Sequence, residues 1–69
     1  MNIKVHYRDI NFKKIDDQIT VPETTTIKEL LDHLGVPMMM AVVNGKVARP
    51  EVLLQENDEV FLFNQMVGG

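Results

Sequence analysis

The residues with the clearest chemical potential close the sequence, where Val67 is followed by Gly68 and Gly69. Because glycine carries no Cβ, a Gly-Gly segment can pass through a narrow channel and present its carboxylate inside the active site of another protein. The carboxylate of Gly69 is then the one group of the chain placed for a reaction. We therefore predict that this chain is a substrate of another enzyme and is not itself a catalyst.

Other residue types that perform chemistry are scarce. The sequence has no Cys, which excludes disulfides, thiolate nucleophiles and Cys-based zinc sites. We expect His6 and His33 to be solvated surface residues, and two histidines alone are too few to hold a metal ion. The acidic pairs Asp16-Asp17 and Asp58-Glu59 are expected in solvated turns, where nothing would split their pKa values for acid–base catalysis. The sequence predicts no bound metal and no bound cofactor.

Length and composition restrict the class of protein further. The 69 residues suffice for one small domain, and 45% hydrophobic with 25% charged residues is typical of a globular chain. A net charge of −3 disfavours nucleic acid as a partner, because the phosphate backbone attracts basic surfaces. No apolar run approaches the roughly 20 residues needed to span a membrane. We expect a cytoplasmic protein that binds neither membrane nor nucleic acid.

The first half of the sequence predicts a hairpin and a helix. Alternation over residues 1–7 and 18–21 indicates two antiparallel strands, joined by an irregular loop over residues 9–15. Thr26 and Glu29 have the spacing of a capping box, and the following apolar residues recur with helical period. Gly35 has the place of a left-handed helix stop. The helix is therefore predicted near residues 26–34.

The second half predicts three more strands. Asn44-Gly45 between apolar runs is a strong hairpin signal, because both residues tolerate positive φ. Residues 49–54 suggest a connector with one helical turn, residues 55–58 a turn, and residues 59–63 a last strand. A hairpin, one helix and a second set of strands predict an α+β, ubiquitin-like β-grasp fold. In this fold a mixed sheet of four to five strands packs on one main helix, with the first and last strands parallel in the middle.

The domain is expected to span residues 1–65, and residues 66–69 are expected to form a flexible C-terminal tail. The core should combine the apolar stripe of the helix with the inward-facing strand residues. Its predicted members are Ile3, Val5, Val21, Ile27, Leu30, Leu31, Leu34, Val42, Val60 and Leu62.

The last strand is apolar on both of its faces. If Val60 and Leu62 point into the core, Phe61 and Phe63 must point outward, since successive strand residues alternate between faces. One helix can cover only one face of the sheet, so the outward phenylalanines beside the tail indicate a contact surface. We predict that a partner binds this surface together with the tail residues that precede Gly-Gly. The predicted partner-binding residues are Phe61, Phe63, Met66 and Val67.

Three segments resemble the ThiS/MoaD family of ubiquitin-like sulfur carriers: residues 43–47 (VNGKV), residues 56–60 (ENDEV) and residues 61–69 (FLFNQMVGG). The resemblance covers essentially the whole chain in element order. It is most specific in residues 56–69, because Gly-Gly follows a strand of this kind in a chain of this length.

The resemblance implies that a ubiquitin-activating-type adenylyltransferase uses ATP and Mg²⁺ to adenylate the carboxylate of Gly69. Sulfur from a persulfide, supplied by a cysteine desulfurase or a rhodanese-like donor, would then replace AMP and leave a thiocarboxylate. Gly68 would share the narrow channel with Gly69. Such a carrier is a protein substrate and needs no Cys of its own.

Within the family, the small subunit of molybdopterin synthase usually carries Pro-Pro just before the tail, where this sequence has Asn64-Gln65. The ending is more similar to that of thiamine-pathway carriers, whose acceptor is thiazole synthase. The long connection over residues 9–15 is closer to the molybdopterin branch, whose acceptor is the large subunit of molybdopterin synthase. Two hypotheses from different classes of protein stay open: a ubiquitin-like modifier conjugated through Gly69, and a regulatory or scaffold module in which Gly-Gly is incidental.

Overall fold

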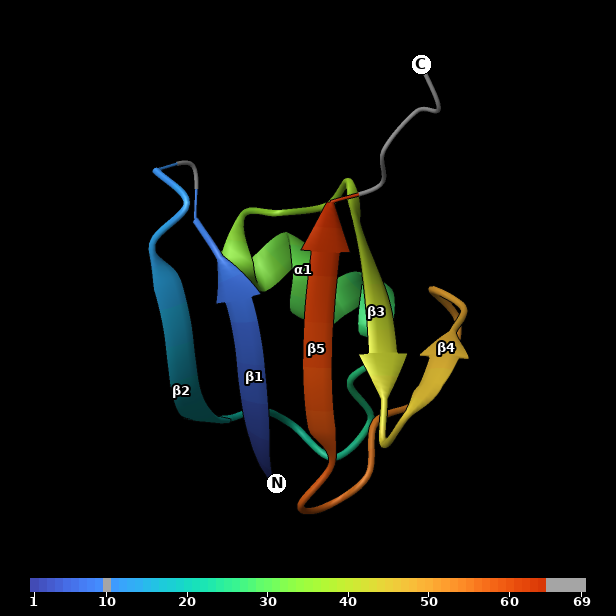
Figure 1. Ribbon diagram of the computed structural model, residues 1–69. Coiled ribbons are helices and arrows are strands. Elements are labelled where there is room, and N and C mark those ends of the chain that lie inside the picture. Colours follow the sequence, from blue (N-terminus) through green and yellow to red (C-terminus); the bar gives the residue numbers. More distant parts are fainter. Residues whose placement is uncertain (10, 65–69) are drawn as a thin grey trace.

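Five strands and one helix follow one another in the described part of the chain (Figure 1). The computed structural model describes residues 1–9 and 11–64, so Ile10, Gln65 and the predicted tail lie outside it. In chain order the elements are β1 (Asn2–Arg8), β2 (Lys14–Thr20), α1 (Ile27–Leu34), β3 (Met39–Val43), β4 (Lys46–Ala48) and β5 (Glu59–Asn64).

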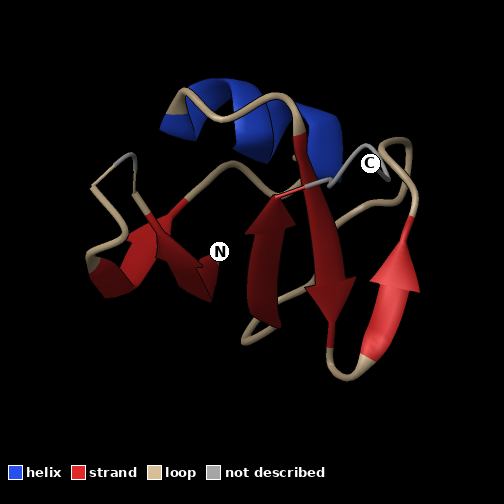
Figure 2. Ribbon diagram, turned by 45° about the horizontal axis from the view of Figure 1, so that its top comes forward, coloured by secondary structure: helices blue, strands red, loops and turns tan. Residues whose placement is uncertain are grey.

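The strands form one mixed sheet in the order β2-β1-β5-β3-β4. The two central strands, β1 and β5, run parallel, and the other neighbours are antiparallel. Helix α1 lies across one face of the sheet (Figure 2). The predicted β-grasp architecture is confirmed, with the first and last strands side by side in the middle.

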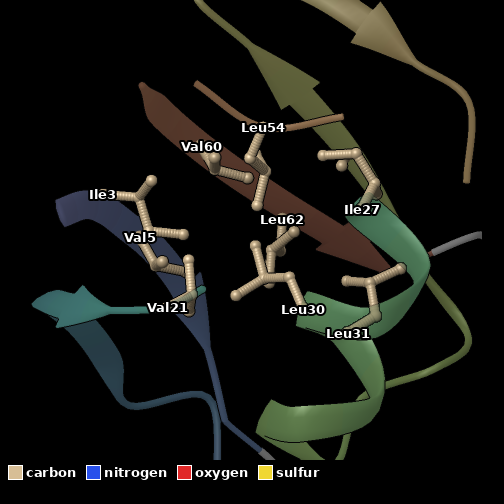
Figure 3. Packing of buried hydrophobic residues seen from close by; sticks show 10 residues of the cluster. Ile3, Val5, Val21, Ile27, Leu30, Leu31, Leu54, Val60 and Leu62 are labelled. Carbon is tan, nitrogen blue, oxygen red and sulfur yellow. The ribbon is translucent and has the colours of Figure 1, made fainter. Parts of the chain in front are cut away.

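The core lies between α1 and the inner face of the sheet (Figure 3). Ile3 and Val5 of β1 and Val60 of β5 are fully buried, as are Ile27 and Leu30 of α1. Each Å² of apolar surface removed from water stabilises the fold by about 25 cal/mol, so this contact is the main driving force for folding. The buried apolar set is Ile3, Val5, Val21, Ile27, Leu30, Leu31, Ala41, Leu54, Val60 and Leu62.

The predicted core differs from the observed one chiefly on β3. Ala41 is buried there, whereas Val42 is only partly buried and is paired with Phe61 on the outer face. Residues 38–43 are apolar without interruption, so their sequence does not show which alternate residues face inward. Leu34, at the end of α1, is also only partly buried, and Leu54 of the β4–β5 connection was not predicted as core.

Strand β2 begins at Lys14, earlier than predicted, and it includes the acidic pair assigned to a turn. Its pairing with β1 is continuous from Asn2↔Thr20 to Arg8↔Lys14. The start of β2 was not predicted, because acidic residues such as Asp16 and Asp17 are rare in strands. They are tolerated here because β2 is an edge strand, where charged side chains also discourage pairing with other molecules.

The β4–β5 connection contains no helical turn in its described residues, contrary to the prediction for residues 49–54. It is instead tied to the start of α1 by backbone hydrogen bonds. Ile27 N donates to Val52 O at 2.9 Å, and Leu54 N donates to Thr25 O at 2.9 Å. These bonds satisfy helix-terminal and loop groups that would otherwise lack partners.

Asp58 is a buried structural residue, and the prediction that it lies in a solvated turn is wrong. Its Oδ1 accepts a hydrogen bond from Asn44 Nδ2 at 2.9 Å, and its Oδ2 accepts one from Gln55 N at 2.8 Å. Asn44 and Gly45 have φ of 50° and 87°, as the predicted hairpin turn requires. Asp58 therefore joins this hairpin to the turn that precedes β5.

The capping box predicted for α1 is present. Thr26 Oγ1 accepts from Glu29 N at 3.2 Å, and Glu29 Oε1 accepts from Thr26 N at 3.0 Å. Loss of such a cap typically costs about 1 kcal/mol, so we expect Thr26→Ala to lower the free energy of unfolding by about that amount. Urea denaturation would measure the change. Thr24→Ala, at an exposed neighbouring position, is the matched control and should have little effect; equal losses would contradict the capping role.

Candidate protein-interaction site

Strand β5 places its two phenylalanines on the face of the sheet opposite α1. Phe61 is 39% exposed and Phe63 is 49% exposed, while Val60 and Leu62, which alternate with them along the strand, are buried. The predicted orientation of the last strand is thus confirmed. Burial of Val60 and Leu62 by α1 fixes this orientation, because a shift of one residue would exchange the two faces.

Neighbouring strands extend the exposed apolar surface around these aromatic rings. Met40 of β3 is paired with Phe63, and Val42 of β3 is paired with both Phe61 and Val47 of β4. Met40 and Val47 are exposed, and neither was predicted as a contact residue. The outer-face patch, as we define it, consists of Met40, Val42, Val47, Phe61 and Phe63.

His6 borders the outer-face patch and links three strands. Its Nδ1 lies 2.6 Å from Asp16 Oδ1 on β2, and its Nε2 lies 2.9 Å from Glu59 Oε2 on β5. The imidazole also stacks on the ring of Phe61, with centroids 4.6 Å apart. The side chain is only 21% exposed, so the prediction of a freely solvated histidine is wrong. The imidazole of His6 therefore packs against one side of the Phe61 ring.

The two carboxylates favour the charged form of His6. The hydrogen bond to Asp16 is the main cause that raises the pKa of His6, and the bond to Glu59 adds to it against partial desolvation. In turn, the hydrogen bond from His6 lowers the pKa of Asp16. The imidazolium therefore joins β2, β1 and β5 as an ionic bridge when it is protonated.

The bridge predicts how stability depends on pH. Because the pKa of folded His6 lies above the ordinary 6.5, the bridge is at full strength below pH 6.5 and is lost as pH rises through the raised value. Asp16 stays ionised over this range because its pKa is lowered. We expect the stability advantage over His6→Gln to be constant below pH 6.5 and to shrink as pH rises above it, in a series of urea denaturations. A difference independent of pH would contradict the ionic bridge.

The described residues contain no group of side chains that could bind a metal ion. In residues 1–9 and 11–64 no group of three or more His, Cys, Asp or Glu side chains is arranged so that it could hold a metal ion. His33 lies exposed in the last turn of α1, as predicted, where the helix dipole favours positive charge. None of the helices in this part of the chain has the length and apolar character needed to cross a membrane.

Strand β5 ends at Asn64, and the predicted site residues Met66, Val67, Gly68 and Gly69 lie outside the described residues. Residues 65–69 follow directly after Phe63 and Asn64. The outer-face patch is therefore continuous in sequence with the segment that carries Gly-Gly. A partner that binds this segment must approach the domain beside Phe63.

A family model described as "ThiS family" matches residues 3–69. The chain belongs to the ThiS family. The match includes the helix and all of the strands except Asn2 at the start of β1, and it extends to Gly69. It agrees with the resemblance inferred from the segments at residues 43–47 and 56–69. Proteins of this ubiquitin-like kind are carriers or modifiers and not enzymes, and they typically work with activating enzymes.

Solved structures similar to this ThiS-family chain have the same fold. SAMP1 from Haloferax volcanii matches with a TM-score of 0.71 and 15% sequence identity, over 100% of both chains. A ubiquitin-like protein from the hyperthermophilic archaeon Caldiarchaeum subterraneum matches with a TM-score of 0.63 and 14% identity, over 99% of this chain and 100% of that chain. A comparison with curated proteins found no match. At these identities the likeness supports the ubiquitin-like β-grasp fold.

Proposed function

We propose that this ThiS-family chain carries sulfur as a thiocarboxylate on Gly69. The observation that carries the proposal is the position of the exposed pair Phe61 and Phe63 on β5, immediately before the segment with Gly-Gly. A partner can bind the aromatic surface and receive the C-terminal segment at the same time. Aromatic side chains at the centre of an interface commonly supply most of its binding energy.

The proposed chemistry begins with activation of a poor electrophile. An oxygen of the Gly69 carboxylate attacks the α-phosphorus of ATP, pyrophosphate leaves with Mg²⁺, and an acyl adenylate forms. The terminal sulfur of a donor persulfide then attacks the acyl carbon and AMP leaves as an acyl disulfide forms. A second thiol cleaves the acyl disulfide, so that the thiocarboxylate is released and a disulfide forms between the thiols. ATP and Mg²⁺ belong to the activating partner, and the carrier supplies only its carboxylate.

We assign the carrier to thiamine biosynthesis, with thiazole synthase as the acceptor of its sulfur. The assignment rests on Asn64-Gln65, which stands where carriers of the molybdopterin branch usually have Pro-Pro. The second candidate acceptor is the large subunit of molybdopterin synthase. Addition of either acceptor enzyme, together with its small-molecule substrate, to the purified thiocarboxylate would distinguish the two, because transfer of the sulfur to that substrate returns Gly69 to a carboxylate.

The experiment that tests the function uses the full chain with its cognate activating enzyme, a sulfur donor, ATP and Mg²⁺. Intact-mass spectrometry should show a gain of about 16 Da, since sulfur replaces one oxygen, and reactions without ATP should show none. Conjugation through Gly69 would instead produce a ladder of larger species on a denaturing gel. A ladder without the mass gain, or no reaction with an active enzyme, would contradict the carrier function.

A further inference from the structure

Three segments meet at one end of the sheet, which we term the exit end because β5 finishes there. Since β1 and β5 are parallel, the β1–β2 loop begins beside the end of β5 (Figure 1). The α1–β3 connection, residues 35–38, lies at the same end. A cavity of about 460 Å³ lies between the two loops, and Phe12, Met38 and Asn64 are among its lining residues.

Phe12 is held in an exposed position by the β1–β2 loop. It is 72% exposed and has a φ of 60°, a conformation that is strained for a bulky residue. The loop maintains it through hydrogen bonds: Phe12 N donates to Asp9 O, Lys13 N donates to Asp9 Oδ1, and Arg8 Nη1 donates to Phe12 O. Nothing in the core requires this ring to face solvent.

Met38 is the counterpart of Phe12 on the second loop, and it is 81% exposed. Both side chains line the same cavity, which gives the exit end a second apolar surface in addition to the outer-face patch. A methionine adapts its shape to a partner, whereas an aromatic ring provides a rigid anchor.

Basic side chains surround this second surface. Arg8, Lys13 and Lys14 are exposed on or beside the β1–β2 loop, although the chain as a whole has seven basic residues and a net charge of −3. Of the nearby acidic groups, Asp9 accepts hydrogen bonds within the loop. Asp16 is paired with His6, and its Oδ2 also lies 3.8 Å from Lys14 Nζ. The exit end thus combines apolar side chains with positive charge.

The length of the C-terminal segment limits where a partner can lie. Residues 65–69 span at most about 17 Å when fully extended. An enzyme that receives Gly69 in an active site must therefore bring the rim of that site against the exit end, within reach of both loops.

We propose that Phe12 and Met38 form a second docking point for the activating enzyme, at the rim of the site that receives Gly69. The inference rests on the proposed function and names the chemistry of the partner surface: an apolar depression bordered by carboxylates. Arg8, Lys13 and Lys14 face these carboxylates, and they increase the association rate through long-range attraction.

The test measures kcat/KM for adenylation by pyrophosphate release with the full chain and its cognate activating enzyme. The double variant Phe12→Asn/Met38→Asn removes both apolar groups, and Asn tolerates positive φ at position 12. We expect kcat/KM to fall at least about tenfold. Leu53→Asn is the matched control, because Leu53 is 57% exposed and pairs with Thr26 at the start of α1, away from the exit end. It should retain the rate of the unmodified chain.

The role of the basic side chains is tested separately, through the salt dependence of adenylation. Adenylation by the unmodified chain should slow as salt concentration rises, and Lys13→Gln/Lys14→Gln should weaken that dependence. If the unmodified chain is adenylated and the Phe12/Met38 variant reacts as fast as the Leu53 control, the docking point is wrong and the carrier function stands. If the unmodified chain is never adenylated by an active enzyme, the carrier function and the docking point both fail.

Discussion

Deletion of Gly69 should abolish formation of the thiocarboxylate by the activating enzyme. The shortened chain would end at Gly68, about 3 Å short of the position that the carboxylate must occupy. Displacement of a reacting group by about 1 Å can already cost roughly 100-fold in rate. Intact-mass spectrometry after reaction with ATP, Mg²⁺ and a sulfur donor would measure the loss.

Gly68→Ala tests the narrow channel without a change in length. We expect this variant to react much more slowly than the unmodified chain, because the added Cβ would contact the walls of the channel. Both variants should keep the unfolding midpoint of the unmodified chain, since the core is formed by residues 3–62. Thiocarboxylate formation in the Gly69 deletion would contradict the requirement for Gly69.

Phe63→Ala should weaken binding to the activating enzyme by at least about 2 kcal/mol, or about 30-fold in Kd. Phe63 lies in the outer-face patch directly before the segment that enters the enzyme, so its ring is placed at the centre of the contact. Isothermal titration calorimetry with the purified enzyme would measure the affinity.

Leu53→Ala is the control for Phe63→Ala, because Leu53 has a similar exposure and lies outside the outer-face patch. The two variants should have similar stability, since Phe63 is 49% exposed and does not belong to the core. Equal affinities for the enzyme would contradict the assignment of the outer-face patch as the partner surface.

Local sequence signals predicted the features of this fold that depend on neighbouring residues. The capping box needs only Thr26 and Glu29, and the hairpin turn needs only Asn44-Gly45. The outward direction of Phe61 and Phe63 followed from strand alternation and from the presence of a single helix to cover the sheet. Each of these inferences uses a short segment, and each is confirmed by the structure.

Features that depend on the register of distant strands were missed. His6 meets Glu59, 53 residues away, only because β1 and β5 are parallel, and it meets Asp16 only because β2 begins at Lys14. The buried role of Asp58 likewise requires Asn44 from another turn. No pattern in the surrounding residues shows these pairings before the topology is known.

The sequence also did not indicate that Phe12, in the β1–β2 loop, is exposed. Phe12 lies in the loop predicted over residues 9–15, and the residue types of that loop do not show that its ring is 72% exposed. Its positive φ is unusual for its residue type and arises from the hydrogen bonds of Asp9 and Arg8 within the loop. Met38 begins the apolar run of residues 38–43, yet β3 begins one residue later, at Met39.

The central claim is that the carboxylate of Gly69 is the reacting group, and fragment-ion mass spectrometry of the reacted chain tests it most directly. The mass gain of the whole protein is ambiguous, because the chain has five methionines and each sulfoxide also adds about 16 Da. We predict a gain that is confined to the fragment containing Gly69, depends on ATP, and can be alkylated by iodoacetamide at the new sulfur. A gain found only on methionine-containing fragments, with an unmodified Gly69, would contradict it.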